Sequence, residues 1–512
     1  MINNFSDILE YSANRFPENI AITDGNKALS YEELNLRVYS VARGFLDMGL
    51  KSGDRVVSLM PNCVENVIVH FAAAKIWCTL IPLGTDINLD ELSWVLWQTK
   101  PKLLLVDESF ESMIEKLQPD VLKKTKLIWV GKQDEGEVNF NDLIEKYSRL
   151  DITYPEGRKN KLCSIIYTSG TSGTRKGVMR SHENNLWTVI SITIHRQYKP
   201  NEIELFVLPM SSVAFYTVFC PNLLCGSTVL IQNEVNKDRV MSEIERHSIN
   251  RIYLLPFMWN AIISDSKFSE HDFTSLKQIM VGATPLSIET KRSIINAFPS
   301  AELYESWGMS EGGQLALEPS DNIRKMGSIG KPLCFNEMKI VDEHGYKVPP
   351  GMVGEITIRG KSVTKGYYQN PEETEKAFPN GDEWFYTGDL ARYDDEGYFY
   401  LSGRKSEIIH SCENNIHPQE IEEALLLHPE ITEAAVFGYP DEECGEVVAA
   451  AVTTQPGSDL SHKDVDKLLE KYIADYKKPK YVLFVDAIPK SSLGKINKRL
   501  LIRSTRQLIE KG

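Results

Sequence analysis

Apolar residues recur every three or four positions in the stretch that follows Ser30. Ser30 and Glu33 have the spacing of a capping box, and Gly49 follows the last apolar position. This pattern predicts an amphipathic helix that packs one face on a core. The apolar positions are Leu34, Val38, Val41, Ala42, Phe45 and Met48.

Strand-like and helix-like patterns alternate along the segments that follow. Short aliphatic runs predict strands, and longer amphipathic stretches predict helices. Their alternation predicts an α/β fold in which helices cover a parallel sheet. We expect strands at residues 55–60, 79–83, 203–208, 227–232 and 278–281, and helices at residues 64–75, 237–245 and 256–264.

The pattern changes after Gly327 to short strands broken by turns, at residues 338–341, 354–359, 384–386 and 398–401. These strands predict a small antiparallel or barrel-like unit. A mixed α+β segment follows Gly403-Arg404-Lys405, so we place a domain boundary there, between residues 1–403 and residues 404–512. In the second domain we expect helices at residues 421–427 and 464–472 and strands at residues 433–438 and 447–452.

Residues 167–177 form a run of hydroxyl groups and glycines that follows an apolar, strand-like run. Glycine lets backbone N–H groups approach an anion, and the hydroxyls and the cations Arg175 and Lys176 can bind phosphate oxygens. A flexible linker is the alternative, but linkers normally have polar flanks on both sides. The order fits neither the P-loop pattern nor G-x-G-x-x-G. We predict a phosphate-binding loop of another kind, containing Thr168, Ser169, Gly170, Thr171, Ser172, Gly173, Thr174 and Lys176.

Two further segments come at the ends of predicted strands, where ligands collect in α/β sheets. They are Gly282-Ala283-Thr284-Pro285 and Glu305-Ser306-Trp307-Gly308-Met309-Ser310-Glu311, and we predict that they line one cleft. Each segment also has a simpler interpretation. Gly282 to Pro285 could be a plain turn, Trp307 could be a core residue, and Glu311 could be a solvated side chain.

Two charged candidates lie nearer the C-terminus. Asp389 ends a predicted strand and could accept hydrogen bonds from ribose hydroxyls, although an aspartate in a turn often serves the turn itself. The cations Lys490, Lys495, Lys498 and Arg499 form a string that is either functional or a solvated face.

Composition excludes several classes of protein. The chain of 512 residues has 42% hydrophobic residues and a formal net charge of −14, which argues against nucleic acid as the main partner. Its eight cysteines are scattered and lack the spacing of a zinc site, so we expect reduced thiols in a cytoplasmic protein. The first residues lack the pattern of a signal peptide, and we expect no transmembrane segment.

The motifs together resemble the adenylate-forming superfamily of acyl-CoA synthetases, adenylation domains and luciferases, and come closest in pattern to the acid–CoA ligases. The resemblance rests on the loop at residues 167–177, Trp307 to Glu311, Tyr386-Thr387-Gly388-Asp389, Gly403-Arg404-Lys405 and Pro489-Lys490-Ser491-Ser492-Leu493-Gly494-Lys495-Ile496. It covers nearly the whole chain. It implies an α/β fold: a large N-terminal domain of two helix-covered β-sheets plus a distorted β-barrel, with a small mobile α+β C-terminal domain.

The resemblance also implies residue roles. The glycine-rich loop would hold the β- and γ-phosphates of ATP, and Trp307 would stack on adenine where the family usually has tyrosine. Gly282, Ala283, Thr284 and the segment from Glu305 to Ser310 would line the nucleotide site. Asp389 and Arg404 would hold the ribose, and Glu311 would help to hold Mg²⁺. Lys495 would approach the substrate carboxylate and the α-phosphate, and Lys405 would act as the hinge.

The implied reaction has two halves. A small-molecule carboxylate attacks the α-phosphorus of Mg-ATP to give an acyl-adenylate, and a thiol, expected to be that of CoA, then displaces AMP. One alternative is a stand-alone adenylating enzyme that loads a carrier-protein phosphopantetheine or an amine. A second is a non-catalytic nucleotide-binding protein, which the presence of Lys495, Asp389 and Glu311 disfavours.

The sequence departs from the family at two places. Ser211-Ser212-Val213 replaces the aromatic residue and histidine that many acyl-CoA synthetases have there, and Ser212 lacks the carboxylate that pairs with an amino-acid substrate. Cys412-Glu413-Asn414-Asn415 replaces the usual Gly-Gly-Glu-Asn in a loop that borders the path of the thiol arm in the family. Side chains in place of two glycines should narrow that path or require another backbone conformation.

Several aromatic and apolar residues could line an acyl pocket: Phe215, Tyr216, Phe257, Met258 and Trp259. They favour a medium or long acyl or aryl carboxylate, and core packing explains them equally well.

Overall fold

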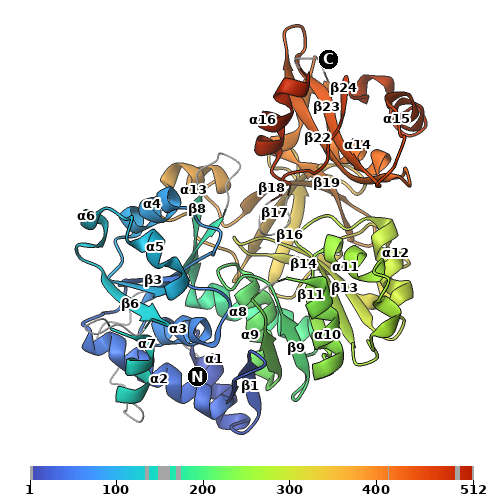
Figure 1. Ribbon diagram of the computed structural model, residues 1–512. Coiled ribbons are helices and arrows are strands. Elements are labelled where there is room, and N and C mark those ends of the chain that lie inside the picture. Colours follow the sequence, from blue (N-terminus) through green and yellow to red (C-terminus); the bar gives the residue numbers. More distant parts are fainter. Residues whose placement is uncertain are drawn as a thin grey trace.

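The computed structural model describes residues 4–132, 138–147, 162–168, 175–233, 235–412, 414–490 and 496–509. In Figure 1 the chain forms two sheet-centred halves side by side, with the C-terminal domain, orange to red, above strands β17–β19.

The first half is built on a six-stranded sheet in the order β6-β5-β3-β4-β7-β8. Its strands pair in parallel except for β7 and β8, which form an antiparallel hairpin. Successive residues of a strand point to opposite faces, so Val56 packs in one core with α2 and α3 while Val57 packs in another with α4. The strands are β3 (Arg55–Leu59), β4 (Thr79–Leu83), β5 (Leu103–Asp107), β6 (Lys126–Val130), β7 (Leu162–Thr168) and β8 (Lys176–Ser181).

Helices and short turns surround this sheet. The predicted first amphipathic helix is α2, which begins with the predicted capping box of Ser30 and Glu33. The elements are α1 (Asp7–Arg15), α2 (Tyr31–Asp47), α3 (Val64–Lys75), α4 (Leu89–Thr99), η1 (Glu108–Phe110), α5 (Glu111–Ile114), α6 (Pro119–Leu122) and α7 (Phe140–Lys146).

The second half is a nine-stranded sheet in the order β15-β14-β13-β12-β11-β9-β10-β1-β2. The central strands from β13 to β1 are parallel, and β2, β14 and β15 are antiparallel. The strands are β1 (Ile20–Thr23), β2 (Ala28–Ser30), β9 (Ile203–Phe206), β10 (Thr228–Ile231), β11 (Arg251–Leu254), β12 (Gln278–Gly282), β13 (Glu302–Gly308), β14 (Gln314–Leu317) and β15 (Lys331–Pro332).

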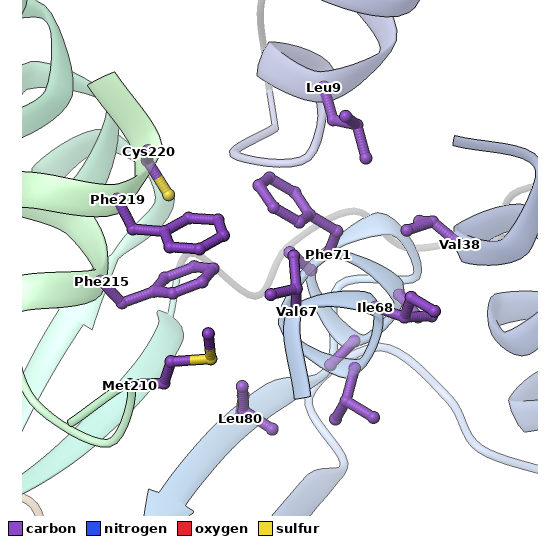
Figure 2. Packing of buried hydrophobic residues seen from close by; sticks show 14 of the residues in the cluster. Leu9, Val38, Val67, Ile68, Phe71, Leu80, Met210, Phe215, Phe219 and Cys220 are labelled. Carbon is purple, nitrogen blue, oxygen red and sulfur yellow. The ribbon is translucent and has the colours of Figure 1, made fainter. Parts of the chain in front are cut away.

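One hydrophobic core joins the two halves. In Figure 2, Val67 and Phe71 of α3 face Phe215 and Phe219 of the π-helix η2. The other face of the nine-stranded sheet packs on α10, α11 and α12. The helices of this half are α8 (His182–Arg196), η2 (Phe215–Phe219), α9 (Cys220–Cys225), α10 (Lys237–His247), α11 (Pro256–Ile263), η3 (Phe268–Glu270), α12 (Ile288–Ala297) and η4 (Pro319–Asp321).

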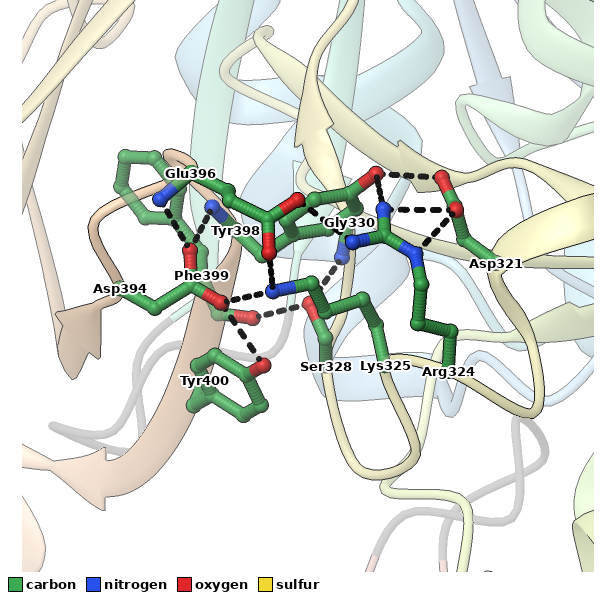
Figure 3. Close-up of polar contacts among 10 residues, drawn as sticks. All are labelled: Asp321, Arg324, Lys325, Ser328, Gly330, Asp394, Glu396, Tyr398, Phe399 and Tyr400. Atoms are coloured by element: carbon green, nitrogen blue, oxygen red, sulfur yellow. Dashed lines mark hydrogen bonds and ion pairs between the residues drawn. The ribbon is translucent and has the colours of Figure 1, made fainter.

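A four-stranded antiparallel sheet follows, in the order β16-β17-β18-β19. A network of polar contacts fixes its β18–β19 hairpin to the segment after β14: Lys325 Nζ contacts Asp394 (2.7 Å) and Glu396 (2.6 Å), and Arg324 bonds to Glu396 and Tyr398 (Figure 3). The elements are β16 (Asn336–Val341), β17 (Gly354–Gly360), α13 (Pro371–Ala377), β18 (Phe385–Tyr393) and β19 (Phe399–Arg404).

The C-terminal domain is a five-stranded sheet in which β21, β20, β23 and β22 are adjacent in that order and β24 pairs with β23. Helices α14 and α15 cover one face, and Leu501 of α16 packs on the other. The elements are η5 (Lys405–Glu407), β20 (Ile409–Ser411), β21 (Asn414–Ile416), α14 (Pro418–Leu425), β22 (Ile431–Asp441), β23 (Gly445–Thr454), α15 (His462–Leu469), η6 (Asp475–Lys477), β24 (Tyr481–Phe484) and α16 (Lys498–Ile509).

The predicted fold class is confirmed, whereas the boundary between residues 403 and 404 remains a prediction. One expectation about the cysteines was wrong: Cys412 and Cys444 are joined by a disulfide, and the other six cysteines are free. Within the described ranges, no helix has the length and apolar composition needed to cross a membrane.

Candidate active site

The glycine-rich loop connects the two strands of the β7–β8 hairpin. Thr168 pairs in register with Lys176 across that hairpin, and its Oγ1 donates a hydrogen bond to the Lys176 carbonyl oxygen (3.5 Å). Ser169, Gly170, Thr171, Ser172, Gly173 and Thr174 lie outside the described residues. The structure therefore places both ends of the predicted phosphate loop.

The two cations after the loop are held by carboxylates. Arg175 forms two hydrogen bonds with Glu91, from Nε (2.8 Å) and from Nη2 (3.1 Å). Lys176 forms an ion pair with Glu373 and lies 5.4 Å from the ring centroid of Tyr367. To bind a phosphate, Lys176 would therefore have to contact the phosphate and Glu373 at the same time, or break its ion pair with Glu373.

The ends of β12 and β13 approach each other closely. A Cβ atom on Gly282 would lie 2.2 Å from the carbonyl oxygen of Ser306, so only glycine fits there. The next residue, Ala283, has a φ of +65°, a left-handed conformation that side chains rarely adopt. Such strain concentrates at functional sites. Thr284 follows directly, at the same edge of the sheet.

Trp307, Asp389 and Arg404 form a chain of contacts. The Trp307 Nε1–H donates to Asp389 Oδ2 (3.0 Å), and Arg404 Nε lies 3.0 Å from Asp389 Oδ1. Asp389 is 6% exposed, whereas the Arg404 side chain is 44% exposed. The two predicted ribose-binding residues are thus brought together, and Trp307 belongs to a hydrophobic core while its indole N–H orients the aspartate.

Glu311 and Glu305 lie in different surroundings. Glu311 is buried, and its Oε1 accepts a hydrogen bond from the Tyr367 hydroxyl (2.9 Å). Burial, together with this carboxylate, raises the pKa of Tyr367. Glu305 forms a buried ion pair with Lys291 (2.7 Å), and burial raises the pKa of Glu305 although Lys291 opposes the shift.

The described residues contain no group of three or more His, Cys, Asp and Glu side chains that could hold a metal. A single carboxylate still suits Mg²⁺, which is commonly bound through one or two carboxylates together with substrate phosphates and water. The acidic, buried Glu311 fits that arrangement.

Glu355 on β17 connects the ribose-binding strand with the predicted hinge. Its Oε1 accepts a hydrogen bond from the Gly388 N–H (2.9 Å), and its Oε2 lies 2.9 Å from Lys405 Nζ. Because Glu355 is 8% exposed and Lys405 is largely exposed, the contact anchors a surface cation to a buried carboxylate.

The segment after β24 contacts the N-terminal half. Lys490 Nζ lies 5.5 Å from the ring centroid of Phe257, and Lys490 also forms an ion pair with Glu433. Lys490 and Ile496 form an isolated β-bridge, and Lys495, between them, lies outside the described residues.

Lys498 follows and contacts Glu407 (2.7 Å) and Glu422 (3.2 Å). Burial opposes its charge, but these two carboxylates raise the pKa of Lys498. Of the string of cations, Lys490 and Lys498 thus have structural partners.

A cavity of about 200 Å³ lies where β3, β4, β9, β10 and β11 end. Phe257 and Met258 line it, as predicted, and so does Ser211. Phe215, Tyr216 and Trp259 do not, because they are buried in the cores with exposures of 0%, 1% and 0%. For these three residues core packing is the correct interpretation.

A second, smaller cavity of about 10 Å³ lies beside Met309 and Gly312, on either side of Glu311 in sequence. Arg180 lines it and is fully buried, and burial lowers its pKa to about 10. Its guanidinium donates to Asn185 Oδ1 (2.7 Å), Thr188 Oγ1 (2.7 Å) and the Ser310 carbonyl oxygen (2.9 Å). Arg180 therefore fixes the backbone next to Glu311.

Sequence reasoning missed Arg180, Glu355 and Tyr367. Arg180 lies four residues after Lys176, but nothing in its immediate sequence distinguishes a buried arginine from a solvated one. Glu355 and Tyr367 act through partners that are distant in the chain, so no local pattern indicates them.

Family models match most of the chain. The model of the AMP-binding enzymes covers residues 9–368, and that of their C-terminal domain covers residues 420–495. The chain belongs to the AMP-binding enzyme family. The predicted superfamily is thereby confirmed.

Relatives of this family member include proteins named as CoA synthases and CoA ligases. The chain is 30% identical over 485 residues to feruloyl-CoA synthase from Amycolatopsis, covering 94% of this chain and 95% of that protein. It is 31% identical over 497 residues to indoleacetate–CoA ligase from Aromatoleum aromaticum, covering 96% of each. The family and the names of these relatives confirm the expectation of an AMP-forming acid–thiol ligase.

Solved structures of the family share the whole fold. The crystal structure of ATP-bound MatB from Rhodopseudomonas palustris matches with a TM-score of 0.90 and 26% identity over 99% of each chain. A fatty acyl-CoA synthetase from Mycobacterium tuberculosis matches with a TM-score of 0.78 and 28% identity over 98% of each chain.

Proposed function

We propose that this protein joins a small-molecule carboxylic acid to the thiol of CoA in two steps, with ATP cleaved to AMP and pyrophosphate. The observation that carries the proposal is the contact between Trp307 near the end of β13 and the Asp389–Arg404 pair of the β18–β19 hairpin, with Glu311 three residues beyond the end of β13. Buried carboxylates beside a glycine-rich hairpin are suited to a magnesium-bound nucleotide.

The described residues have separate tasks in binding ATP. Asp389 accepts and Arg404 donates hydrogen bonds, so the pair suits the two ribose hydroxyls. The walls on either side are Gly282 to Thr284 and Ser306 to Ser310, and the absence of a side chain at Gly282 lets these two walls meet closely. The hydroxyls and N–H groups of the loop at residues 168–174, with Lys176, would bind the β- and γ-phosphates.

Glu311 would hold Mg²⁺ together with phosphate oxygens, and the ion would offset charge on the phosphates. Tyr367 restrains Glu311 through its hydroxyl, and Arg180 restrains the preceding carbonyl. These contacts keep the carboxylate in place before the nucleotide arrives, which is the arrangement that electrostatic catalysis requires.

Two domains would supply the first step. We propose that residues 1–403 bind ATP and the acid, and that residues 404–512 bring Lys495 to the carboxylate and the α-phosphate. The contact between Lys490 and Phe257 supports this arrangement, because it holds one end of the segment that contains Lys495 against the N-terminal half.

We infer an aryl-bearing or medium-length acid as the substrate class. The cavity of about 200 Å³ beside Phe257 and Met258 suits an apolar group, and two relatives are named for aryl-bearing acids. Ser212 donates its hydroxyl hydrogen to the Pro209 carbonyl oxygen (2.8 Å) and offers no carboxylate to an amino group, which disfavours amino acids.

CoA is the proposed acceptor, and the cytoplasm is the proposed location. A carrier-protein phosphopantetheine or an amine is the second candidate, favoured by Cys412 at a loop position where the family usually has glycine. Product analysis with free CoA, compared with a phosphopantetheinyl carrier protein, separates the two.

The role of Lys495 is tested by Lys495→Ala. We expect acid-dependent ATP–pyrophosphate exchange to fall about 100- to 1000-fold, because a preorganised cation at the developing charge is lost. ATP binding, measured by calorimetry, should change little, because the residues proposed to hold the phosphates and the ribose are all retained.

Arg499→Ala is the matched control, since Arg499 is an exposed cation of the same string at the start of α16. It should leave the exchange rate unchanged. Full exchange activity in Lys495→Ala would remove this lysine from the mechanism.

A further inference from the structure

The smaller cavity, of about 10 Å³, is lined mainly by polar side chains. They include Arg180 of β8, Thr188 of α8, Thr217 of η2 and Gln314 at the start of β14. A space of this size holds about one oxygen-sized atom. The cavity is therefore suited to a single polar group and not to an apolar chain.

Arg180 is a fully buried cation that has no ion pair in the described part of the chain. Glu311 favours its charge through space, but no carboxylate among those residues contacts the guanidinium. A buried charge without a paired counter-charge is costly, so groups of this kind are normally paired. The protein thus holds a positive charge beside the cavity that no contact balances.

The hydrogen bonds of Arg180 leave one donor unused. A guanidinium has five N–H groups. Nε donates to Asn185 Oδ1, and Nη1 donates one of its two hydrogens to the Ser310 carbonyl oxygen. Nη2 donates to Thr188 Oγ1 and, over a longer distance (3.4 Å), to the Asn184 carbonyl oxygen. The second Nη1–H has no acceptor among the residues that the structure describes.

Two further side chains of the cavity wall have unused hydrogen-bonding groups. The Thr217 hydroxyl and the Gln314 amide form no hydrogen bond with the described residues. The Thr188 hydroxyl, in contrast, accepts from Arg180 and donates to a backbone carbonyl. Gln314 pairs with Gly308 across β13 and β14, so the cavity adjoins the segment that would line the nucleotide site.

Magnesium would increase this imbalance of charge. In the proposed function Glu311 holds Mg²⁺, so the ion would offset the negative charge that favours the cation of Arg180. An anion in the cavity would then supply the counter-charge of Arg180.

We propose that this cavity binds an anionic oxygen of the acid substrate, so that the preferred acids carry a second carboxylate in addition to the one that is activated. This inference rests on the proposed function and narrows its substrate class. Arg180, Thr217 and Gln314 would donate hydrogen bonds to that oxygen. The apolar part of the acid would occupy the larger cavity. Ser211 lines the larger cavity and Val213 lines the smaller one, so both border the same short segment.

The test compares three acids of nearly equal shape: terephthalate, its neutral monoamide and para-methylbenzoate. The meta isomers, and aliphatic diacids with monoacids of equal chain length, form two further sets. In the best set, kcat/KM for acid-dependent ATP–pyrophosphate exchange should be about tenfold to 100-fold higher for the diacid than for either neutral partner, the range given by a hydrogen bond to a charged group. Equal values for the diacid and its monoamide in every set would overturn the proposal.

Two substitutions of Arg180 separate its charge from its structural role. Arg180→Met and Arg180→Lys should both slow exchange with every acid, because both lose the fork that holds the Ser310 carbonyl. Arg180→Met should also abolish the preference for the diacid, whereas Arg180→Lys should keep part of it, since it retains a cation. The same loss of rate for all three acids in Arg180→Met would assign Arg180 a structural role alone and overturn the proposal.

Thr217→Val tests the opposite wall of the cavity with a side chain of almost the same shape and without disturbing the contacts of Arg180. The preference for the diacid should fall about twofold to tenfold, as expected for one hydrogen bond. Thr193→Val on α8 is the matched control, because Thr193 does not line the cavity, and it should leave the preference unchanged. An unchanged preference in Thr217→Val would overturn the proposal.

Binding gives a readout that does not depend on turnover. Stable sulfamoyl analogues of the acyl-adenylates of the diacid and of its monoamide are titrated into the protein by calorimetry, without Mg²⁺. The diacid analogue should bind about tenfold more tightly to the wild type and no more tightly to Arg180→Met. Equal binding by the wild type would overturn the proposal. Absence of exchange with every acid would refute the proposed adenylation as well, whereas exchange at equal rates refutes only this subsite.

Discussion

Single residues in this protein carry charge in places where water is excluded. Glu204 on β9 is completely buried, and its Oε2 accepts a hydrogen bond from Asn222 Nδ2. Burial raises the pKa of Glu204 to about 7, while Asn222 and the nearby Arg196 and Arg251 act in the opposite direction. Glu204 is thus among the buried groups that titrate near neutral pH.

The sign of its contribution to stability follows from proton binding. Because the folded protein binds this proton more tightly than the unfolded chain does, folding is favoured at low pH. That contribution is lost as pH rises from about 4.5 through 7. The shift corresponds to roughly 2 to 4 kcal/mol.

Replacing the carboxyl group tests this account. Glu204→Gln retains an oxygen that can accept the Asn222 hydrogen bond and has no charge to bury. We expect the variant to be more stable than the wild type above pH 7 and to lose less stability between pH 5 and 8. Urea unfolding across this range measures both effects, and parallel pH profiles for the two proteins would contradict the assignment.

At the scale of secondary-structure elements, β17 connects the nucleotide site with the hinge through Glu355. We expect Glu355→Gln to keep an acceptor for the Gly388 N–H and to lose the ion pair with Lys405. Because Lys405 is largely exposed, the pair contributes at most about 1 kcal/mol. The orientation that places Lys490 beside Phe257 should therefore become less populated.

The expected result is a decrease of about twofold to fivefold in the rate of ATP–pyrophosphate exchange, with transfer from preformed acyl-adenylate to CoA unchanged. Glu337→Gln is the control, since it removes the exposed ion pair with Arg359 on the neighbouring strand and should change neither rate. Equal loss of both half-reactions in Glu355→Gln would indicate structural damage rather than an effect on domain orientation.

Local patterns predicted many elements well. Residues 64–75 and 79–83 were predicted with the observed bounds of α3 and β4, because apolar periodicity and short aliphatic runs are sufficient there. The strand predicted at residues 384–386 was too short: β18 continues to Tyr393 because β17 and β19 pair on both sides of it. Thr387, Gly388 and Asp389 look like a turn in sequence and become strand through those partners.

The candidate site was only partly predictable for the same reason. The motifs indicate Trp307 and Asp389 separately, but their contact spans 82 residues and appears only in the folded chain. Phe215, Tyr216 and Trp259 have the composition of a pocket and pack in the core instead. Hydrophobicity indicates that a side chain is buried, not what it is buried against.

At the scale of the whole molecule, the candidate site lies where strands of the two large sheets end. Strands β3, β4, β9, β10 and β11 end at the larger cavity, and the neighbouring β12 and β13 end at Gly282 and Gly308. The C-terminal domain contacts this edge through Lys490. An acid bound in the cavity and a nucleotide bound beside β13 would thus lie close together.

The most direct test of adenylation is exchange of labelled pyrophosphate into ATP with the wild-type protein and no CoA, across a panel of aryl, arylalkyl and aliphatic carboxylic acids. We predict Mg²⁺-dependent exchange that requires an acid, is strongest with aryl-bearing or medium-length acids, and gives AMP as the nucleotide product once CoA is added. Absence of exchange with every acid, or release of ADP and phosphate instead of AMP and pyrophosphate, would contradict the account.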